Sequence, residues 1–293
     1  MQELKKPLIS IIVCSIRPQE AEALSRNVAQ TIGVEYEMII HDNRGSDKGI
    51  CQVYNECAER AQGEYLCFAH EDISFLTKDW GREIISKLSE QECGVIGFAG
   101  STVKYAYRYG WQGVRRFTRK NYLAGTSIGK QSLRTSGSNA PYCEVICLDG
   151  MCLFVRKDVW AKFGFDHQTF EGFHSYDTDF TTSVAYGGYH NYVCHSVLVE
   201  HRSTGSFSKS WYESVLLYNA KWAGRLPLYA KTETNQKQVE QYAAATEAFG
   251  LKLLLKFGIL PKDELWREIK GFWLRNKFSL SAYILIIRYL SLK

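Results

Sequence analysis

Acidic and imidazole side chains gather at three places in the sequence, each just after a stretch that predicts a β-strand. They read Asp42-Asn43, His70-Glu71-Asp72, and Tyr176-Asp177-Thr178-Asp179 with His201 further on. A single carboxylate at such a place also fits a turn or a helix cap, and for Asp42 alone that interpretation is preferred. Several of them at one edge of one sheet instead favour a cation site or an acid–base site.

Apolar strand-like stretches alternate with amphipathic stretches over the first hundred residues. Strands are expected at residues 7–15, 37–41, 64–69 and 94–99, and helices at residues 20–31, 49–61 and 80–89. Later strands are expected at 151–155 and 191–200, with helices near 158–163 and up to Tyr186. This alternation predicts an α/β fold with a mostly parallel sheet and helices on both faces. Such sheets bind ligands at the carboxyl ends of their strands.

The length and the cysteines limit the organisation of the chain. The 293 residues fit one large domain, expected at 1–225, followed by a helical extension at 226–293, because residues 224–227 are the best linker. None of the nine cysteines forms a CxxC pair, which disfavours zinc-ribbon or thioredoxin chemistry. Several cysteines lie in apolar runs as small hydrophobic residues, and this usage favours the cytoplasm.

The net charge of +5 is concentrated in the C-terminal tail. Residues 251–293 carry nine basic and three acidic side chains, whereas the first 250 residues carry 27 and 28. The near-neutral body disfavours nucleic-acid binding. The tail has two interpretations, a helix packed on the main domain or a basic amphipathic helix on the inner face of an anionic membrane. No apolar stretch approaches the roughly 20 residues that a membrane span needs.

Aromatic side chains alternate within residues 101–142, where the order of elements is hard to predict. Tyr105, Tyr107, Tyr109 and Trp111 occupy every second position. The pattern fits either a half-buried hairpin or a flap on the acceptor side of a sugar-binding cleft, since sugar faces stack on aromatic rings.

In combination, these motifs resemble the family 2-like glycosyltransferases of the GT-A fold over roughly residues 8–206. Residues 10–15 are similar to the opening strand of that family, and residues 63–72 to the strand that delivers its DXD metal motif. Asp42 stands where the family has a nucleotide-binding aspartate. Residues 176–179 resemble its acidic Glu-Asp element, with Phe165-Asp166 ahead of it and His201 as the late metal-ligand histidine.

The resemblance implies a fold and a set of site residues. It implies a GT-A domain in which Asp72, His201 and His70 hold a divalent cation, and the imidazoles favour Mn²⁺ over Mg²⁺. It also implies a nucleotide-diphosphate sugar as donor, most simply a UDP-sugar. The donor-binding positions are Ser15, Asp42, Asn43, Glu71 and Asp72. Asp177 is the expected general base that activates an acceptor hydroxyl, with Asp179 in reserve.

The chain departs from the family pattern at two positions. His70 replaces the first aspartate of DXD, giving a His-x-Asp variant, and Tyr176 replaces the glutamate of the Glu-Asp element. The first change bears on the affinity and choice of metal, and the second leaves Asp177 as the matching base. His70 either binds the cation or orients Asp72 through a hydrogen bond without touching metal.

The expected activity is that of an inverting, metal-dependent hexosyltransferase in glycan or polysaccharide synthesis, acting on a glycan or lipid-linked acceptor. A non-catalytic nucleotide-sugar-binding module is the alternative, because the metal motif is altered. A sugar nucleotidyltransferase fits less well, because residues 14–20 lack the glycine-rich phosphate loop of those enzymes.

Overall fold

The computed structural model describes residues 8–125, 131–136, 140–203, 205 and 207–292, so Pro7, the expected start of the first strand, lies outside the described residues. The central sheet has seven strands in the order β10-β13-β5-β12-β3-β1-β2. Their bounds, in chain order, are β1 Ile9–Ser15, β2 Tyr36–Asp42, β3 Tyr65–Ala69, β5 Cys93–Gly97, β10 Tyr142–Val145, β12 Cys152–Arg156 and β13 His190–Cys194. Strands β12 and β10 run antiparallel to their neighbours and the other five are parallel, which confirms the mostly parallel sheet.

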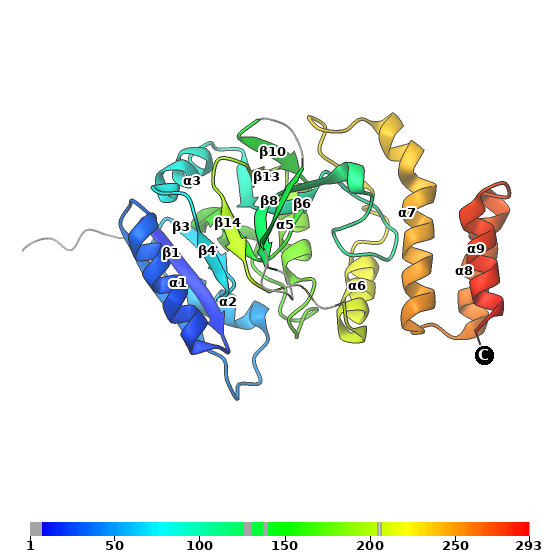
Figure 1. Ribbon diagram of the computed structural model, residues 1–293, viewed down its shortest axis with the longest axis horizontal. Helices are drawn as coiled ribbons and strands as arrows, with labels where there is room; N and C mark the ends of the chain where they lie inside the picture. The colour runs from blue at the N-terminus through cyan, green and yellow to red at the C-terminus, as the bar shows by residue number, and fades with distance from the viewer. Residues whose placement is uncertain (1–7, 126–130, 137–139, 204, 206, 293) are drawn as a thin grey trace, which may run out of the picture.

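Helices cover both faces of this sheet, as expected (Figure 1). They are α1 Pro18–Thr31, α2 Ile50–Arg60, α3 Trp80–Leu88, α4 Lys157–Phe163 and α5 Tyr176–Tyr186. The side chains of β1 alternate between two cores. Ile11 and Val13 pack in the core that contains α1 and α3, whereas Ile12 packs in the core that contains α2, α4 and α5. A strand with both faces buried is mostly apolar, which explains its hydrophobic run, and the buried Ser10 within it is hydrogen-bonded to Glu37 and to the backbone N–H of Gly63.

A second sheet crosses the end of the first, in the order β11-β6-β8-β14-β4 with β9 on β8. Its strands are β4 Ile73–Phe75, β6 Ala99–Ser101, β8 Thr118–Gly125, β9 Gln131–Ser136, β11 Cys147–Leu148 and β14 Val199–His201. The prediction of one strand over 191–200 was therefore wrong. The chain leaves β13 at Cys194 and enters the other sheet at Val199, because Asn121 of β8 hydrogen-bonds three carbonyls of the intervening turn.

The alternating aromatic residues do not form the hairpin that was one interpretation of their pattern. They lie between β7 (Val103–Lys104), which pairs with β15 (Leu228–Tyr229), and the 3₁₀ turn η1 (Arg115–Phe117). The hairpin of this segment is β8–β9 instead. Tyr105 and Tyr109 are buried in a small core with Val239, which lies in the tail helix α7 (Gln236–Phe257). Their rings therefore fill space between the main domain and the tail.

The C-terminal part is helical, as expected, with α6 Lys209–Lys221, α7 Gln236–Phe257, α8 Lys262–Arg275 and α9 Leu280–Leu290. Apolar residues of all four helices form one core, including Tyr212, Leu254, Phe272 and Leu285. Figure 1 places α8 and α9 at the opposite end of the molecule from α1. Among the described residues, no helix is long and apolar enough to cross a membrane.

Candidate active site and metal centre

Three of the predicted ligands meet where the two sheets join. His70 and Asp72 lie in the turn between β3 and β4, and His201 ends β14. Because β14 pairs antiparallel with β4, His201 lies opposite Ile73, next to Asp72. The expectation that Asp72 and His201 both end strands of one sheet was wrong, since the histidine reaches the cluster through the second sheet. Their ligand atoms and that of His70 all lie within 4.8 Å of one another.

The donor atoms of this cluster face one another. Nε2 of His201 lies 3.4 Å from Oδ1 of Asp72 and 3.5 Å from Nδ1 of His70. The other oxygen of Asp72 accepts a hydrogen bond from the backbone N–H of Ser203 (3.0 Å). One carboxylate oxygen and two ring nitrogens are thus left pointing at a common centre, a donor set that suits Mn²⁺ and similar divalent cations.

The charges of the cluster favour the same interpretation. Burial opposes ionisation of Asp72, which is 2% exposed, but His201 and Ser203 together hold the pKa of its carboxyl well below the usual range. Burial, reinforced by the charge of His201, lowers the pKa of His70. The cluster therefore combines an anionic oxygen with a neutral imidazole, the protonation states in which both groups bind metals.

The second ring nitrogen of His70 is held by Tyr176, at the start of α5. The His70 Nε2 and Tyr176 Oη atoms are 2.9 Å apart, and the tyrosine hydroxyl also donates to the carbonyl of Gly150 (3.2 Å). Burial raises the pKa of Tyr176 well above its usual value, so the hydroxyl keeps its proton. A Cβ at Gly150 would lie 2.3 Å from this hydroxyl oxygen, which explains the glycine at that position.

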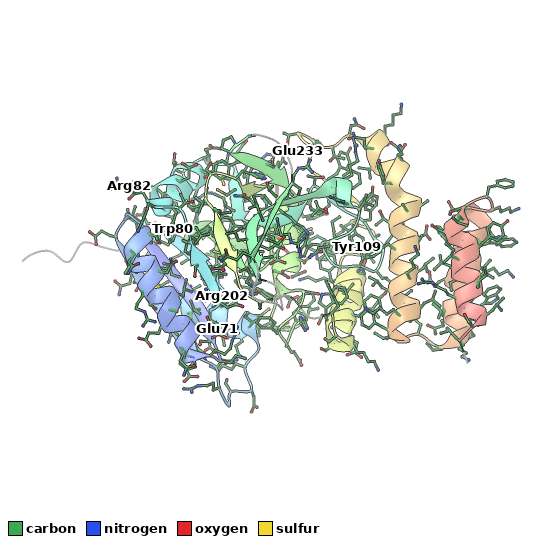
Figure 2. The ribbon with its side chains drawn as sticks, in the orientation of Figure 1. Glu71, Trp80, Arg82, Tyr109, Arg202 and Glu233 are labelled. Carbon is green, nitrogen blue, oxygen red and sulfur yellow. The ribbon has the colours of Figure 1, made fainter. Side chains whose placement is uncertain are left out.

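Glu71 and Ser15, two predicted donor-binding residues, are hydrogen-bonded to each other. Oε2 of Glu71 accepts from Ser15 Oγ (2.6 Å) and from the backbone N–H of Arg17 (2.9 Å). Burial opposes ionisation of Glu71, but these bonds and the guanidinium of Arg17 lower the pKa of its carboxyl. Glu71 thereby fixes the turn after β1. Figure 2 shows Glu71 and Arg202, the neighbour of His201, at the same end of the molecule.

Arg17 is a charged neighbour of these residues that is not among the donor-binding positions predicted above. Its guanidinium is held by Glu71 and lies 3.4 Å from Oδ2 of Asp72, while half of the side chain stays exposed. The signal that could have found it is its position two residues beyond the carboxyl end of β1, where ligands bind in such sheets.

Asp42 and Asn43 lie one strand further along the same edge. The side chain of Asp42 is exposed and bonded to Arg44, which lowers the pKa of Asp42 to about 2. The backbone N–H of Asn43 donates to the carbonyl of Ser15 (2.8 Å), which places the two strand ends side by side. Oδ1 of Asn43 is buried and has no hydrogen-bond partner among the described residues.

The two aspartates of the acidic element have different surroundings. Asp177 accepts from the backbone N–H of Gly150 (2.8 Å), so it adjoins the same glycine that Tyr176 contacts through the carbonyl. Burial, followed by the charge of Asp149, raises the pKa of Asp177 to about 7. A carboxyl group with that pKa suits general base catalysis near neutral pH.

Asp179, the reserve base, faces helix α6 instead. Its two oxygens accept from Nζ of Lys221 (2.7 Å) and from the indole N–H of Trp222 (2.8 Å). Lys221 also pairs with Asp166 at 2.8 Å. The carboxylate of Asp179 is 3% exposed, so it joins α5 to α6 as part of an ion-paired network.

Phe173 is an exposed aromatic residue that sequence reasoning missed. Its side chain lies in the loop before α5 and is 53% exposed, with its ring centroid 5.5 Å from that of His70. An apolar ring left in solvent beside polar ligands offers a flat face for a sugar or a base. It is isolated in the sequence between glycine and histidine, so no periodic pattern marks it.

The fold agrees with comparisons to known proteins. A model of a family described as "Glycosyltransferase like family" matches residues 10–215. No curated protein sequence matches the chain. A solved structure of the mannosyltransferase PcManGT from Pyrobaculum calidifontis, in complex with GDP-Man and Mn²⁺, is similar at 15% identity and a TM-score of 0.50, covering 98% of this chain and 87% of that one. A structure of GalNAc-T7 with UDP, GalNAc and Mn²⁺ has 8% identity and a TM-score of 0.49, covering 85% of this chain and 57% of that one. Because the family model spans most of the chain, this protein belongs to the glycosyltransferase-like family.

Proposed function

We propose that this protein is an inverting glycosyltransferase that transfers a hexosyl group from a nucleotide-diphosphate sugar to an acceptor hydroxyl, with a divalent cation at His70, Asp72 and His201. The convergence of two ring nitrogens and one carboxylate oxygen within 4.8 Å is the observation that carries the proposal. Membership of the family supports glycosyl transfer. The mannosyltransferase of similar fold is bound to GDP-Man and Mn²⁺, which supports a nucleotide sugar and Mn²⁺ here.

In this proposal the donor lies along the edge formed by the ends of β1, β2 and β3. Arg17 contacts the diphosphate, because its half-exposed guanidinium already lies beside Asp72. Asn43 lies on this edge beside Ser15, and a UDP-sugar is our first choice of donor. Ser15, Glu71 and Asp42 shape this edge through the hydrogen bonds of the β1–α1 and β2–α2 turns.

The reaction is a single displacement at the anomeric carbon. His70, Asp72 and His201 would hold a divalent cation, which would supply positive charge to stabilise the diphosphate leaving group. Asp177 removes the proton of the acceptor hydroxyl while its oxygen bonds to the anomeric carbon and the bond to the phosphate oxygen breaks. We keep Asp179 as the reserve base, and its bonds to Lys221 and Trp222 are the reason to rank it second. One displacement inverts the anomeric configuration.

The test is turnover of labelled UDP-sugars and GDP-sugars with Mn²⁺, with Mg²⁺ and with a chelator, using glycan and lipid-linked acceptors. We expect transfer that depends on the cation, and an inverted anomeric signal in the NMR spectrum of the product. Tight donor binding without turnover would support the alternative, a non-catalytic nucleotide-sugar-binding module.

We also infer that residues 1–225 perform catalysis and that the extension at 226–293 contacts the inner face of an anionic membrane, near a lipid-linked acceptor in polysaccharide synthesis. Helix α9 buries Ala282 and Leu285 but exposes an apolar stripe on its other side. The stripe consists of Leu280, Tyr283, Ile287 and Leu290, all at least 50% exposed. Residues 276–293 contain three basic and no acidic side chains, which matches an anionic lipid surface.

Cosedimentation with vesicles tests this membrane contact. The full-length protein should sediment with vesicles that contain anionic lipid, and less so as salt rises, since each basic residue near the surface contributes about 1 kcal/mol. Changing Leu280 and Ile287 to Gln should reduce the bound fraction. Equal sedimentation of the two proteins would leave α9 as a packing element and the protein as a cytoplasmic enzyme without membrane contact.

A further inference from the structure

The two positions at which the chain departs from the glycosyltransferase pattern are in contact. His70 and Tyr176 are 106 residues apart in the sequence, yet their side chains share a hydrogen bond of 2.9 Å. One replaces a carboxylate of the DXD motif and the other replaces the glutamate ahead of the expected base. The contact therefore joins the two departures into one local arrangement.

The direction of the hydrogen bonds follows from counting protons. A tyrosine hydroxyl has one proton, and here it goes to the carbonyl of Gly150, which can only accept. With the proton placed on that carbonyl, the hydroxyl oxygen accepts from Nε2 of His70, and that nitrogen then carries the imidazole proton. The other nitrogen, Nδ1, is left with a free lone pair, and it is the atom that lies 3.5 Å from Nε2 of His201.

Packing fixes the position of the Tyr176 hydroxyl. The residue is 3% exposed, and its ring lies against those of Tyr54 (5.8 Å between centroids) and Phe165 (6.0 Å). The close approach to Gly150 leaves no room for a side chain there. A neutral phenol also adds no negative charge beside His70, whereas a glutamate would.

We propose that Tyr176 is a positioning residue that selects the tautomer and the orientation of His70, making His70 the third ligand of the cation. This inference rests on the proposed function, because it concerns the same metal centre. The paired exchange replaces an oxygen ligand by nitrogen, so the site gains preference for Mn²⁺ over Mg²⁺, which keeps to oxygen ligands. Partners of a metal-bound histidine of this kind contribute about 10- to 100-fold to metal affinity.

Direct titration of Mn²⁺, followed by electron paramagnetic resonance with UDP or GDP present and absent, tests the proposal without relying on activity. Tyr176→Phe should weaken Mn²⁺ binding by about 10- to 100-fold. The matched control is Tyr218→Phe, which removes another fully buried hydroxyl, bonded to Thr182 at 2.9 Å. The control should bind Mn²⁺ as the unaltered protein does.

A double-mutant cycle separates positioning from folding. If Tyr176 acts through His70, then Tyr176→Phe should have no further effect on Mn²⁺ affinity in a His70→Ala background. An undiminished loss in that background would overturn the proposal, as would unchanged binding by the single variant. Absence of Mn²⁺ binding by the unaltered protein would overturn the proposed function itself.

Nitrogen NMR of the unaltered protein gives a measurement that needs no variant. The imidazole of His70 should show a proton on Nε2 and none on Nδ1 before metal is added. The opposite tautomer would overturn the proposal, because Nδ1 could not then bind a cation without rearrangement.

Discussion

The cluster of His70, Asp72 and His201 and the network of Asp166, Asp179 and Lys221 both bring titratable residues together from distant parts of the chain. In the network, every close approach joins opposite charges or a donor and an acceptor, as in the bonds of Lys221 to both aspartates. In the cluster, two ring nitrogens and one carboxylate oxygen face one another. The carboxylates of the network are therefore paired with a cationic side chain, whereas the three ligand atoms of the cluster would be stabilised by a bound cation.

This difference shows what separates a structural acid from a ligand. Asp72 follows a strand and Asp179 lies in the first turn of a helix, and both carboxylates are buried, so neither position nor burial distinguishes the two aspartates. The supply of hydrogen-bond donors distinguishes them, because Trp222 and Lys221 occupy both oxygens of Asp179, whereas among the described residues Oδ1 of Asp72 meets only His201. Mutations that remove one carboxylate at a time should therefore have unlike effects in the two regions.

The largest effect is expected from Asp72→Asn. An amide in place of the carboxylate removes the anionic ligand, so Mn²⁺-dependent donor binding should fall below detection in calorimetry. The same change at Asp166, which bonds Lys221, should leave the donor affinity nearly unaltered. If Asp72→Asn bound the donor as tightly as the unaltered protein, and a chelator had no effect, Asp72 would not be a metal ligand. The distinction between the cluster and the network would then be wrong.

Asp177→Asn should affect catalysis but not metal binding. Loss of the general base is expected to lower kcat by at least about 10²-fold, while Mn²⁺ and donor affinity change little. Steady-state kinetics and titration on the same preparation measure both. If Asp179→Asn lowers kcat in this way and Asp177→Asn does not, the base belongs to the network, contrary to our assignment.

Asp179→Asn should act mainly on stability. The substitution leaves Lys221 partly buried with one of its two carboxylates, and breaking a buried, hydrogen-bonded pair costs about 2 kcal/mol in the free energy of unfolding. Urea denaturation monitored by tryptophan fluorescence measures this change. Mn²⁺ affinity should stay within about twofold of the unaltered protein, and a large loss of affinity would show that the network extends into the metal centre.

The sequence predicted the fold class and the identity of the residues that converge, because hydrophobic periodicity and strand-end polarity are local signals. The mostly apolar run at 9–13 predicted a strand with both faces buried. The order of the motifs along the chain predicted that His70, Asp72 and His201 form one metal site. The sequence did not predict that His201 arrives through a second sheet. That result depends on the pairing of β4 with β14, a contact between segments more than 120 residues apart.

Other features could not be predicted because they depend on contacts between residues that are distant in the sequence, and not on a local sequence pattern. Asp177 and Asp179 are equivalent in sequence, and only the placement of α6 gives Lys221 and Trp222 to Asp179. The alternating tyrosines of 105–109 mimic a strand, but helix α7 packs on them and their rings fill a core. In the sequence, Tyr176 is only a departure from the family pattern. Its contact with His70 depends on the folded structure, which places the tyrosine hydroxyl beside the imidazole.

The smallest expected effect concerns the pH at which Asp177 works. Burial and then the charge of Asp149 raise its pKa to about 7, so a base must lose its proton in that range before it can accept one. In the free enzyme, kcat/KM should rise by up to about tenfold per pH unit as pH approaches 7 from below, and then level off. Asp149→Asn removes the like charge and should move this limb to lower pH. Because burial is the larger cause, the shift should stay below about one unit. Rates measured from about pH 5 to 9 test both statements, and a limb that moves to higher pH in the variant would contradict the assignment of Asp177 as the titrating base.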